Sequence, residues 1–280
     1  MSRFCYGYNV RANGIRQHLL RFGGEGPKLL LVPGITSPAI TWGFVAERLG
    51  LYFDVHVLDI RGRGLSESGP TLDYSLDAMS ADVSALLEVL DWHQAMLLGH
   101  SMGARIAIRA AVRTPTRIGR LLLIDPPVSG PGRRPYPAPL SWYVDSIRLM
   151  RDGADMEALR PFSPTWSDEH LRLRAEWLHT CDEAAIAQAY EGFHTDDIHA
   201  DLARLTVPGL LMIAGRGGVI GPDDAKEIAS LAPRLTQKTA ERAGHMIPWD
   251  DLQGFMRIIG GYVTDIGITQ SIIGDSHGCQ

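Results

Sequence analysis

Residues 95–104 read Ala-Met-Leu-Leu-Gly-His-Ser-Met-Gly-Ala, and this stretch decides the fold. The apolar run from Ala95 to Leu98 is short, as in a buried strand, whereas the Ala- and Ile-rich run from Ala104 to Val112 suits a helix. Ser101 therefore lies at a strand-to-helix turn with Gly99 and Gly103 on either side, which is the pattern of a nucleophile elbow. The glycines let neighbouring backbone approach closely while the serine hydroxyl stays accessible.

The same turn predicts part of a catalytic site. Because a helix begins here, the backbone N–H of Met102 has no intrahelical acceptor, and we expect it to donate to an oxyanion. A pattern with so few fixed letters also occurs by chance in loops and helix caps. The catalytic interpretation therefore requires a base, an acid and a second oxyanion donor elsewhere in the chain.

The composition is that of a globular protein with a full core: 280 residues, 45% hydrophobic and 21% charged. A formal net charge of −5 argues against nucleic acid or an anionic membrane as partner, so an anionic substrate has to be held by local arginines. Residues 1–10 contain no signal-peptide core, and no segment approaches the roughly 18 apolar residues of a membrane span. We expect a soluble, cytoplasmic protein; the sequence does not indicate its oligomeric state.

Short apolar strands alternate with helical segments along most of the chain. A hairpin at Asn13-Gly14 is followed by predicted strands at Lys28 to Val32, Val55 to Leu58, Ala95 to Leu98, Arg120 to Ile124, Gly209 to Ala214 and Leu235 to Lys238. Ser75 is a plausible N-cap for a helix whose apolar stripe faces the sheet. This alternation predicts an α/β fold: a mainly parallel central sheet with helices on both faces and ligands at the carboxyl ends of the strands.

The alternation breaks between residues 126 and 205. Six prolines between Pro126 and Pro139 prevent regular structure at first, and amphipathic helices follow, one of them starting at Ser167 and running through His179. We interpret residues 126–205 as an inserted helical lid on a core formed by residues 1–125 and 206–265. Residues 266–280 form a Gly-rich polar tail, which we expect to be disordered.

His245 is the predicted base. After a nucleophile elbow the order along the chain is serine, acid, histidine, and His245 lies in a late loop between the last predicted strand and a helix. A neutral imidazole there can take the serine proton and return it to a leaving group. The other nine histidines lack this loop context.

Asp125 is the predicted acid, although its place is unusual for this order. In most proteins of this kind the acid follows the strand that here ends at Ala214, but Gly215-Arg216-Gly217-Gly218 offers no carboxylate. Asp125 directly follows an apolar strand and needs a strong partner to remain ionised, such as the imidazolium of His245. The rivals Asp223 and Asp224 follow Pro222 and resemble first-turn helix residues.

The second oxyanion donor is expected in the loop after the strand that ends at Val32. The backbone N–H of Ile35 is the candidate, and it would act together with that of Met102. The stretch from Asp59 to Ser66 resembles a loop that is common in proteins with such an elbow, and we expect its role to be structural.

Residues 1 to about 265 resemble the α/β-hydrolases and, more narrowly, the family of N-formylmaleamate deformylases of aerobic nicotinate degradation. The resemblance rests on the stretches 35–42, 124–134, 165–169 and 214–220, which are more specific than the elbow. It implies hydrolysis of N-formylmaleamate to maleamate and formate without metal or cofactor, by a triad of Ser101, Asp125 and His245. The substrate would be a small dicarboxylate-like anion.

Two arginines and a tryptophan are candidates for binding the substrate. Arg216 at a strand end and Arg133 at the start of the lid can each offer a fork of donors to a carboxylate, although both also fit surface arginines. Trp166 belongs to a set of lid aromatics that either pack on the core or line a pocket.

Other functions remain open at this point. The same triad would serve an enol-lactonase, an esterase or a carbon-carbon bond hydrolase of ring-cleavage products. A receptor that keeps the fold without turnover is a more distant alternative, which a fluorophosphonate probe of Ser101 would test.

Overall fold

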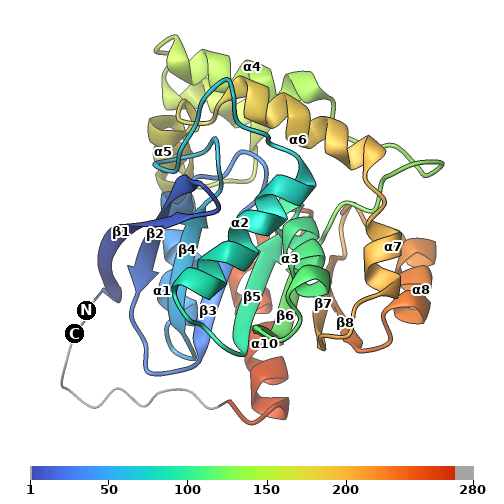
Figure 1. Cartoon of the computed structure of the whole chain (residues 1–280). Helices are drawn as coiled ribbons and strands as arrows, with labels where there is room; N and C mark the ends of the chain where they lie inside the picture. Colours follow the sequence, from blue (N-terminus) through green and yellow to red (C-terminus); the bar gives the residue numbers. More distant parts are fainter. Residues whose placement is uncertain (1, 269–280) are drawn as a thin grey trace.

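The computed structural model describes residues 2–268, so most of the predicted tail lies outside the described residues. Eight strands form one sheet in the order β1-β2-β4-β3-β5-β6-β7-β8, antiparallel at β1–β2 and β2–β4 and parallel elsewhere (Figure 1). The strands are β1 (Phe4–Ala12), β2 (Ile15–Phe22), β3 (Lys28–Val32), β4 (Asp54–Asp59), β5 (Ala95–His100), β6 (Ile118–Ile124), β7 (Gly209–Ala214) and β8 (Leu235–Ala240). The predicted α/β fold with a mainly parallel sheet is confirmed.

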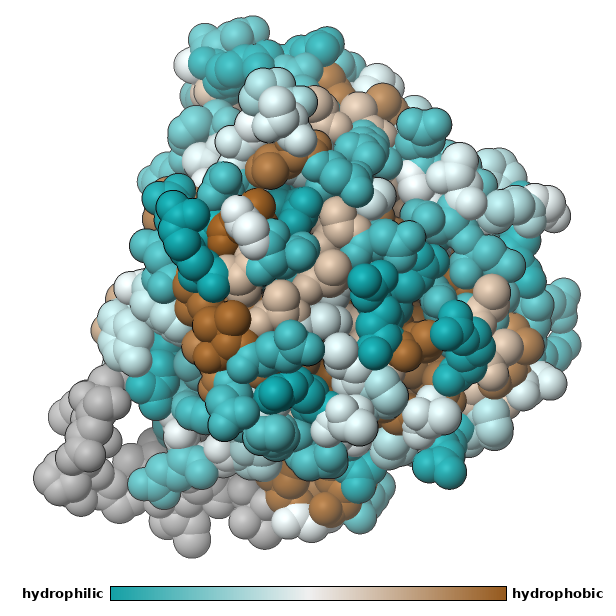
Figure 2. Space-filling model, viewed as in Figure 1, coloured by the Kyte–Doolittle hydropathy of each residue, from teal (hydrophilic) through white to brown (hydrophobic). Residues whose placement is uncertain are grey.

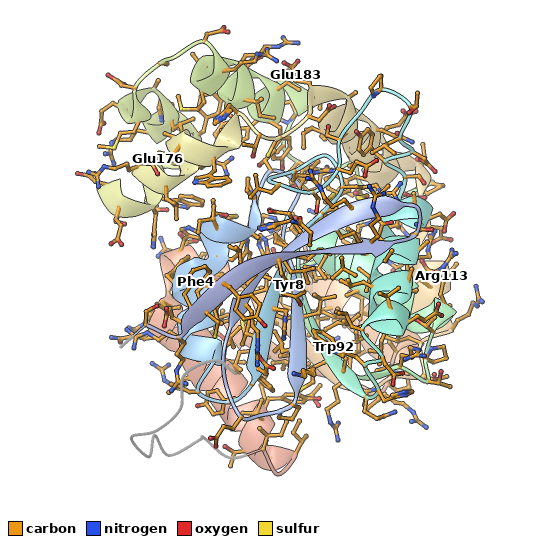
Figure 3. All side chains as sticks on the ribbon, turned by 60° about the vertical axis from the view of Figure 1, so that its left-hand side comes forward. Phe4, Tyr8, Trp92, Arg113, Glu176 and Glu183 are labelled. Atoms are coloured by element: carbon orange, nitrogen blue, oxygen red, sulfur yellow. The ribbon has the colours of Figure 1, made fainter. Side chains whose placement is uncertain are left out.

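The hairpin that opens the sheet forms where the sequence predicted it. Ala12 pairs with Ile15 across a two-residue turn, and both turn residues have positive φ, 52° at Asn13 and 76° at Gly14. Asn-Gly tolerates this left-handed backbone, and the resulting turn follows the twist of the strands. Phe4 and Tyr8 on β1 mark this edge of the sheet (Figure 3).

Helices cover both faces of the sheet. The α2 (Leu76–Val89), α3 (Met102–Arg113) and α8 (Pro222–Leu231) helices contribute to one apolar cluster, whereas α1 (Gly43–Leu49) and α10 (Leu252–Asp265) contribute to the other. Ser75 caps α2 as predicted, its side chain accepting a hydrogen bond from the Ala78 N–H. The central strands are buried on both sides, as in β3, where Leu29 and Leu30 are fully enclosed. Two short helices, η1 (Ala39–Trp42) and α9 (Ile247–Asp250), lie in the loops near the carboxyl ends of the strands.

Between β6 and β7 the chain forms a series of helices, most of which lie in a layer above the sheet, while the last lies beside α3 and α8 (Figure 1). Residues 126–139 form no helix or strand, as their prolines predict, and α4 (Leu140–Arg151), η2 (Met156–Phe162), α5 (Asp168–Leu178), α6 (Glu183–Thr195) and α7 (Ile198–Ala203) follow. Ser167 is the N-cap of α5, as predicted. Glu176 and Glu183 mark this layer in Figure 3. The division into core and lid at residues 126 and 205 stays a prediction.

Buried arginines connect this layer to the sheet. Arg105 on α3 donates to the backbone carbonyls of Pro127 and Ser129 in the proline-rich segment and of Gly192 and Asp196 at the end of α6. Because a buried guanidinium has to satisfy several N–H groups, it fixes the chain segments that supply the acceptors.

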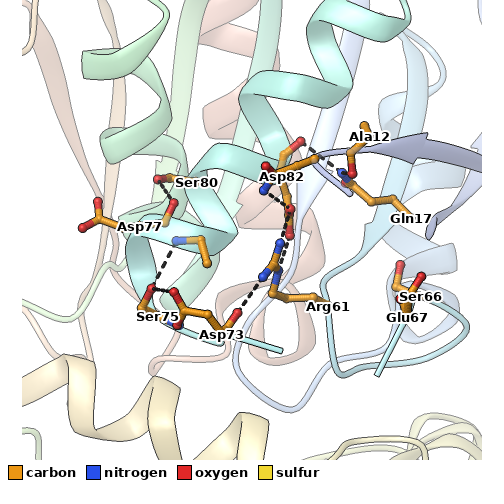
Figure 4. Close-up of polar contacts among 12 residues, drawn as sticks. Ala12, Gln17, Arg61, Ser66, Glu67, Asp73, Ser75, Asp77, Ser80 and Asp82 are labelled. Carbon is orange, nitrogen blue, oxygen red and sulfur yellow. Dashed lines mark hydrogen bonds and ion pairs between the residues drawn. The ribbon is translucent and has the colours of Figure 1, made fainter. Parts of the chain in front are cut away.

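The loop after β4 is held by a polar network (Figure 4). Arg61 makes a bidentate ion pair with Asp82 of α2, and Gln17 donates to the carbonyl of Asp82. Asp59 accepts hydrogen bonds from the Ala39 N–H at 2.6 Å and the Leu65 N–H at 3.1 Å. This network joins the predicted structural loop to the segment after β3.

The surface in Figure 2 is mainly hydrophilic, and its hydrophobic residues form small separate patches. Within residues 2–268, no helix combines the length and the apolarity that a membrane crossing requires.

The two glycines of the elbow are required by close backbone contacts. A Cβ at position 103 would lie 1.9 Å from the Val32 carbonyl oxygen, and one at position 99 would lie 2.3 Å from the Gly103 carbonyl oxygen. Neither neighbour is a flexible side-chain end that can move away cheaply.

Gly103→Ala should therefore reduce the free energy of unfolding by roughly 2–4 kcal/mol, because α3 has to shift away from β3. The matched control is Gly261→Ala in α10, where a Cβ would meet nothing within 4 Å and helix propensity favours alanine by about 1 kcal/mol. Urea unfolding of both variants measures the difference, and equal stabilities would contradict the close-packing argument.

Candidate active site

Ser101 lies between β5 and α3 in a strained conformation, with φ 54° and ψ −120°. A non-glycine residue with this backbone is costly and persists only where its surroundings impose it. Here the Ser101 N–H donates to the Ile124 carbonyl at 2.9 Å, and the Ser101 carbonyl accepts from the Ala104 N–H at 3.0 Å. The serine is held at the end of the buried strand, as the elbow pattern predicts.

His245 reaches Ser101 from a loop between β8 and α9. Its Nε2 lies 3.0 Å from Ser101 Oγ, and its Nδ1 lies 2.7 Å from Asp125 Oδ2. With the proton on Nδ1, the imidazole donates to the carboxylate and Nε2 accepts the serine O–H. The backbone carbonyl of His245 lies 3.0 Å from His100 Nε2, which helps to fix the loop.

Asp125 follows β6 and is fully buried. Its φ of 43° turns the chain sharply after Ile124. Besides His245, its carboxylate accepts hydrogen bonds from two backbone N–H groups, those of Ala214 at 3.3 Å and Val219 at 3.1 Å. A buried carboxylate with three hydrogen-bond donors is satisfied.

The glycine-rich turn after β7 makes room for that carboxylate. A Cβ at Gly218 would lie 2.7 Å from Asp125 Oδ2, 2.9 Å from Oδ1 and 2.5 Å from the Ala214 Cβ. The turn that lacks an acid of its own is therefore packed against the acid supplied by the neighbouring strand β6.

The rival acids are used elsewhere. Asp224 accepts from the Gly221 N–H at 2.7 Å and from Arg134 at 2.8 Å, and Asp223 pairs with Lys226 at 3.0 Å. Both lie in the first turn of α8, as we predicted from their position after Pro222.

Two backbone N–H groups next to the serine have no acceptor among residues 2–268. They are those of Met102, the first residue of α3, and Ile35, in the loop after β3. The loop comes close to the serine, since a Cβ on Gly34 would lie 3.6 Å from Ser101 Cβ. These are the two donors that the sequence predicted for an oxyanion.

Arg63 fixes the loop after β3 by a hydrogen bond to the Ile35 carbonyl. Its Nε donates to the Ile35 carbonyl at 3.0 Å, and its terminal nitrogens donate to the carbonyls of Arg61 and Ala185. Because the Ile35 carbonyl points to Arg63, the orientation of this loop is set by a buried group.

His100 stays neutral beside the base. Burial is the main cause that lowers its pKa to about 3, and the nearby charge of His245 lowers it further. Its ring lies 5.0 Å from that of His245 and 5.3 Å from that of Trp42. A neutral ring here adds no positive charge that would compete with protonation of His245.

The three residues predicted to bind substrate lie in different surroundings. Arg133 forms a bidentate ion pair with Glu227 at 2.7 and 2.8 Å, so its charge is already compensated. Arg216 is exposed, and its side chain reaches the Arg242 carbonyl at 3.4 Å. Trp166 is buried and stacks on Trp249 with ring centroids 4.8 Å apart. Their substrate-binding roles stay predictions.

Arg174 was missed in the sequence, and Tyr136 and Tyr143 were included only among the lid aromatics that either pack on the core or line a pocket. Arg174 did carry a signal, because Leu171, Arg174 and Leu178 share the buried face of α5, where a charged residue is unusual. The tyrosines lie in or just after the proline-rich segment, which has no periodicity that would orient them.

Tyr136, which is buried, and Tyr143, which is half-buried, form a polar pair. Their hydroxyls are 2.8 Å apart. Burial raises the pKa of Tyr136, while its hydrogen bond with Tyr143 lowers it less. Burial also raises the pKa of Tyr143 well above its usual value. Both hydroxyls therefore stay protonated at neutral pH and can donate hydrogen bonds.

These contacts join a serine, a histidine and an aspartate in one hydrogen-bonded series, which is the arrangement used in nucleophilic acyl transfer. The oxyanion roles of the Ile35 and Met102 N–H groups stay predictions. Within residues 2–268, no three His, Cys, Asp or Glu side chains are grouped so that they could hold a metal ion.

Comparisons with known proteins agree with this geometry. Residues 27–252 match the family model of the alpha/beta hydrolase fold. N-formylmaleamate deformylase of Pseudomonas putida is 60% identical over 263 residues, which cover 94% of this chain and 98% of that protein.

Solved structures of hydrolases also match this chain. The crystal structure of an N-formylmaleamic acid deformylase from Pseudomonas putida S16 matches with a TM-score of 0.88 and 61% identity, covering 91% of this chain and 99% of that chain. E-2-(acetamidomethylene)succinate hydrolase matches with a TM-score of 0.75 at 22% identity over 92% of this chain and 100% of that chain, which shows a shared fold. The chain therefore belongs to the α/β-hydrolase family.

Proposed function

We propose that this protein hydrolyses the formyl amide of N-formylmaleamate to maleamate and formate, with Ser101 as nucleophile, His245 as base and Asp125 as the acid that orients it. The observation that carries the proposal is the unbroken hydrogen-bonded series from Ser101 Oγ through His245 to Asp125. The 60% identity to a deformylase over nearly the whole chain supports this choice of substrate.

In the first half of the reaction Ser101 Oγ attacks the formyl carbon while His245 Nε2 takes the hydroxyl proton. The oxyanion that forms accepts hydrogen bonds from the N–H groups of Ile35 and Met102, and each such donor typically contributes on the order of 100-fold in rate. The C–N bond then breaks, and His245 passes its proton to the departing nitrogen. Maleamate leaves and the formyl group remains as an ester on Ser101.

The leaving nitrogen needs little assistance because it is bonded to a second acyl group, which delocalises its developing charge. In the second half of the reaction His245 takes a proton from water, and the oxygen of that water attacks the formyl ester. Formate leaves, and the proton returns through His245 to Ser101 Oγ.

The same machinery would open an enol-lactone or an ester or cleave a carbon-carbon bond, so the substrate has to be tested directly. The proposed substrate is a small anion. The cytoplasmic location stays a prediction.

Purified protein should release formate from N-formylmaleamate, with maleamate as the co-product, and Ser101→Ala should abolish the release. Formate is measured enzymatically and maleamate by chromatography. A fluorophosphonate probe should label the wild type but not Ser101→Ala, which separates an enzyme from a receptor. Rapid hydrolysis of a lactone or vinylogous diketone without formate release from N-formylmaleamate would refute the proposed substrate.

Asp125→Asn should lower kcat by roughly 10⁴-fold, because an amide cannot hold His245 in the required tautomer. Asp223→Asn is the matched control, since its exposed carboxylate only pairs with Lys226. Steady-state kinetics and thermal unfolding of both variants separate catalysis from stability. Near-normal turnover of Asp125→Asn would mean that another residue is the acid of the triad.

Gly218→Ala should lower kcat by roughly 10–100-fold with little change in KM, because the added methyl group has to displace the Asp125 carboxylate and thereby misplace His245. Gly69→Ala, where a Cβ would meet nothing within 4 Å, serves as control. If the two variants have the same kcat, the turn after β7 does not position the acid.

A further inference from the structure

Arg174 is a buried cation on α5 with unused hydrogen-bonding capacity. Its exposed fraction is 8%, and its Nη1 and Nη2 each donate at 3.1 Å to Thr36, one to the carbonyl and the other to Oγ1. Its Nε has no partner among residues 2–268. A guanidinium has five N–H groups, so most of its donors are left without an acceptor.

No carboxylate of the described residues forms an ion pair with Arg174. The guanidinium lies 5.5 Å from the centre of the Trp166 ring. Burial lowers its pKa, and the groups that act in the opposite direction are Cys181 and Tyr143, neither of which is a carboxylate. Three other buried arginines have more acceptors. Arg61 pairs with Asp82, and Arg63 donates to three backbone carbonyls. Arg105 also lacks a partner for its Nε, but its terminal nitrogens donate to four backbone carbonyls.

A buried charge without a counter-ion is costly. The cost falls when backbone carbonyls accept the N–H groups, as they do for Arg63 and Arg105, and Arg174 has only one such carbonyl. An anion that binds next to Arg174 would recover part of the cost. The chemistry of Arg174 is therefore that of an anion site.

The contacts with Thr36 place Arg174 on the loop that approaches Ser101. Thr36 follows Ile35, the proposed oxyanion donor, and Arg174 donates to its carbonyl and to its Oγ1. In the same loop a Cβ on Gly34 would lie 3.6 Å from Ser101 Cβ.

We propose that Arg174 binds the carboxylate of the substrate and makes this site selective for anionic acyl compounds. The inference rests on the proposed function, because N-formylmaleamate carries its carboxylate at the opposite end from the formyl carbon. The planar fork of a guanidinium matches a carboxylate, and burial strengthens the pair. A neutral substrate would leave Arg174 uncompensated and lose this contribution.

The test compares Arg174→Met with Arg172→Met, a control that removes an exposed arginine from the same helix. The two substrates are N-formylmaleamate and the neutral N-formylacetamide. We expect Arg174→Met to reduce kcat/KM for N-formylmaleamate roughly 100-fold, mainly through KM, and to change that for N-formylacetamide less than about 3-fold. Arg172→Met should match the wild type on both.

Equal losses on the two substrates would overturn the proposal, because they would mean that Arg174 only positions the Thr36 segment. The melting temperature adds a second readout, since removing an uncompensated buried charge should not lower it. If Arg174→Met does not fold, Arg174→Lys takes its place. Loss of the planar fork should still reduce kcat/KM for N-formylmaleamate more than kcat/KM for N-formylacetamide, and equal reductions would again overturn the proposal.

A further measurement separates failure of this inference from failure of the proposed function. Maleamate should slow fluorophosphonate labelling of Ser101 in the wild type but not in Arg174→Met, whether or not N-formylmaleamate is the substrate. One outcome is that the wild type releases no formate while maleamate still slows its labelling at Ser101 and leaves the labelling of Arg174→Met unchanged. In that case the proposed function fails and the anion site stands. If maleamate does not protect the wild type, the anion site is refuted.

Discussion

The hydrogen bond between Asp125 Oδ2 and His245 Nδ1 is the interaction on which the site depends. A fully buried carboxylate is tolerable only where donors surround it, and the backbone N–H groups of Ala214 and Val219 complete the set. The left-handed backbone at Asp125 aims the side chain toward β7, and the glycine at position 218 leaves space for it. The strain at Asp125 and the missing side chain at Gly218 thus belong to one arrangement, in which the acid comes from β6 although it occupies the region after β7.

The loop after β3, which contains Ile35 and Thr36, depends on a second constraint: two buried guanidiniums donate to its consecutive carbonyls. Arg63 binds the carbonyl of Ile35 and Arg174 binds that of Thr36. The first is satisfied by backbone acceptors, whereas the second keeps free donors. Arg63 therefore explains how the loop is fixed, and Arg174 is the residue that we propose to distinguish an anionic substrate from a neutral one.

The fold was predictable because its signals are local. The apolar runs at residues 28–32 and 209–214 match β3 and β7, the turn at Asn13-Gly14 forms the hairpin, and Ser75 and Ser167 cap their helices. Ser101 and His245 were also predictable, because a strained turn and a late loop impose recognisable residue types nearby. Strand ends were less predictable: β6 begins at Ile118 and β8 continues to Ala240, since ladder pairing, and not hydropathy alone, decides where a strand stops.

By itself the sequence determined the order of strands and helices along the chain, the serine at the strand-to-helix turn, the histidine in the late loop and the carboxylate after β6, because each of these depends on residues that are neighbours in the chain. Only the tertiary structure decided which arginines already have a carboxylate partner. Arg133 is paired with Glu227, Arg216 is exposed, and Arg174 is buried with no carboxylate partner among the residues that the structure describes. Whether an arginine can bind a ligand depends on ion-pair partners that lie far away along the chain and on how much water the packing removes from around its charge. Neither the partners nor the burial can be derived from the neighbouring residues in the sequence.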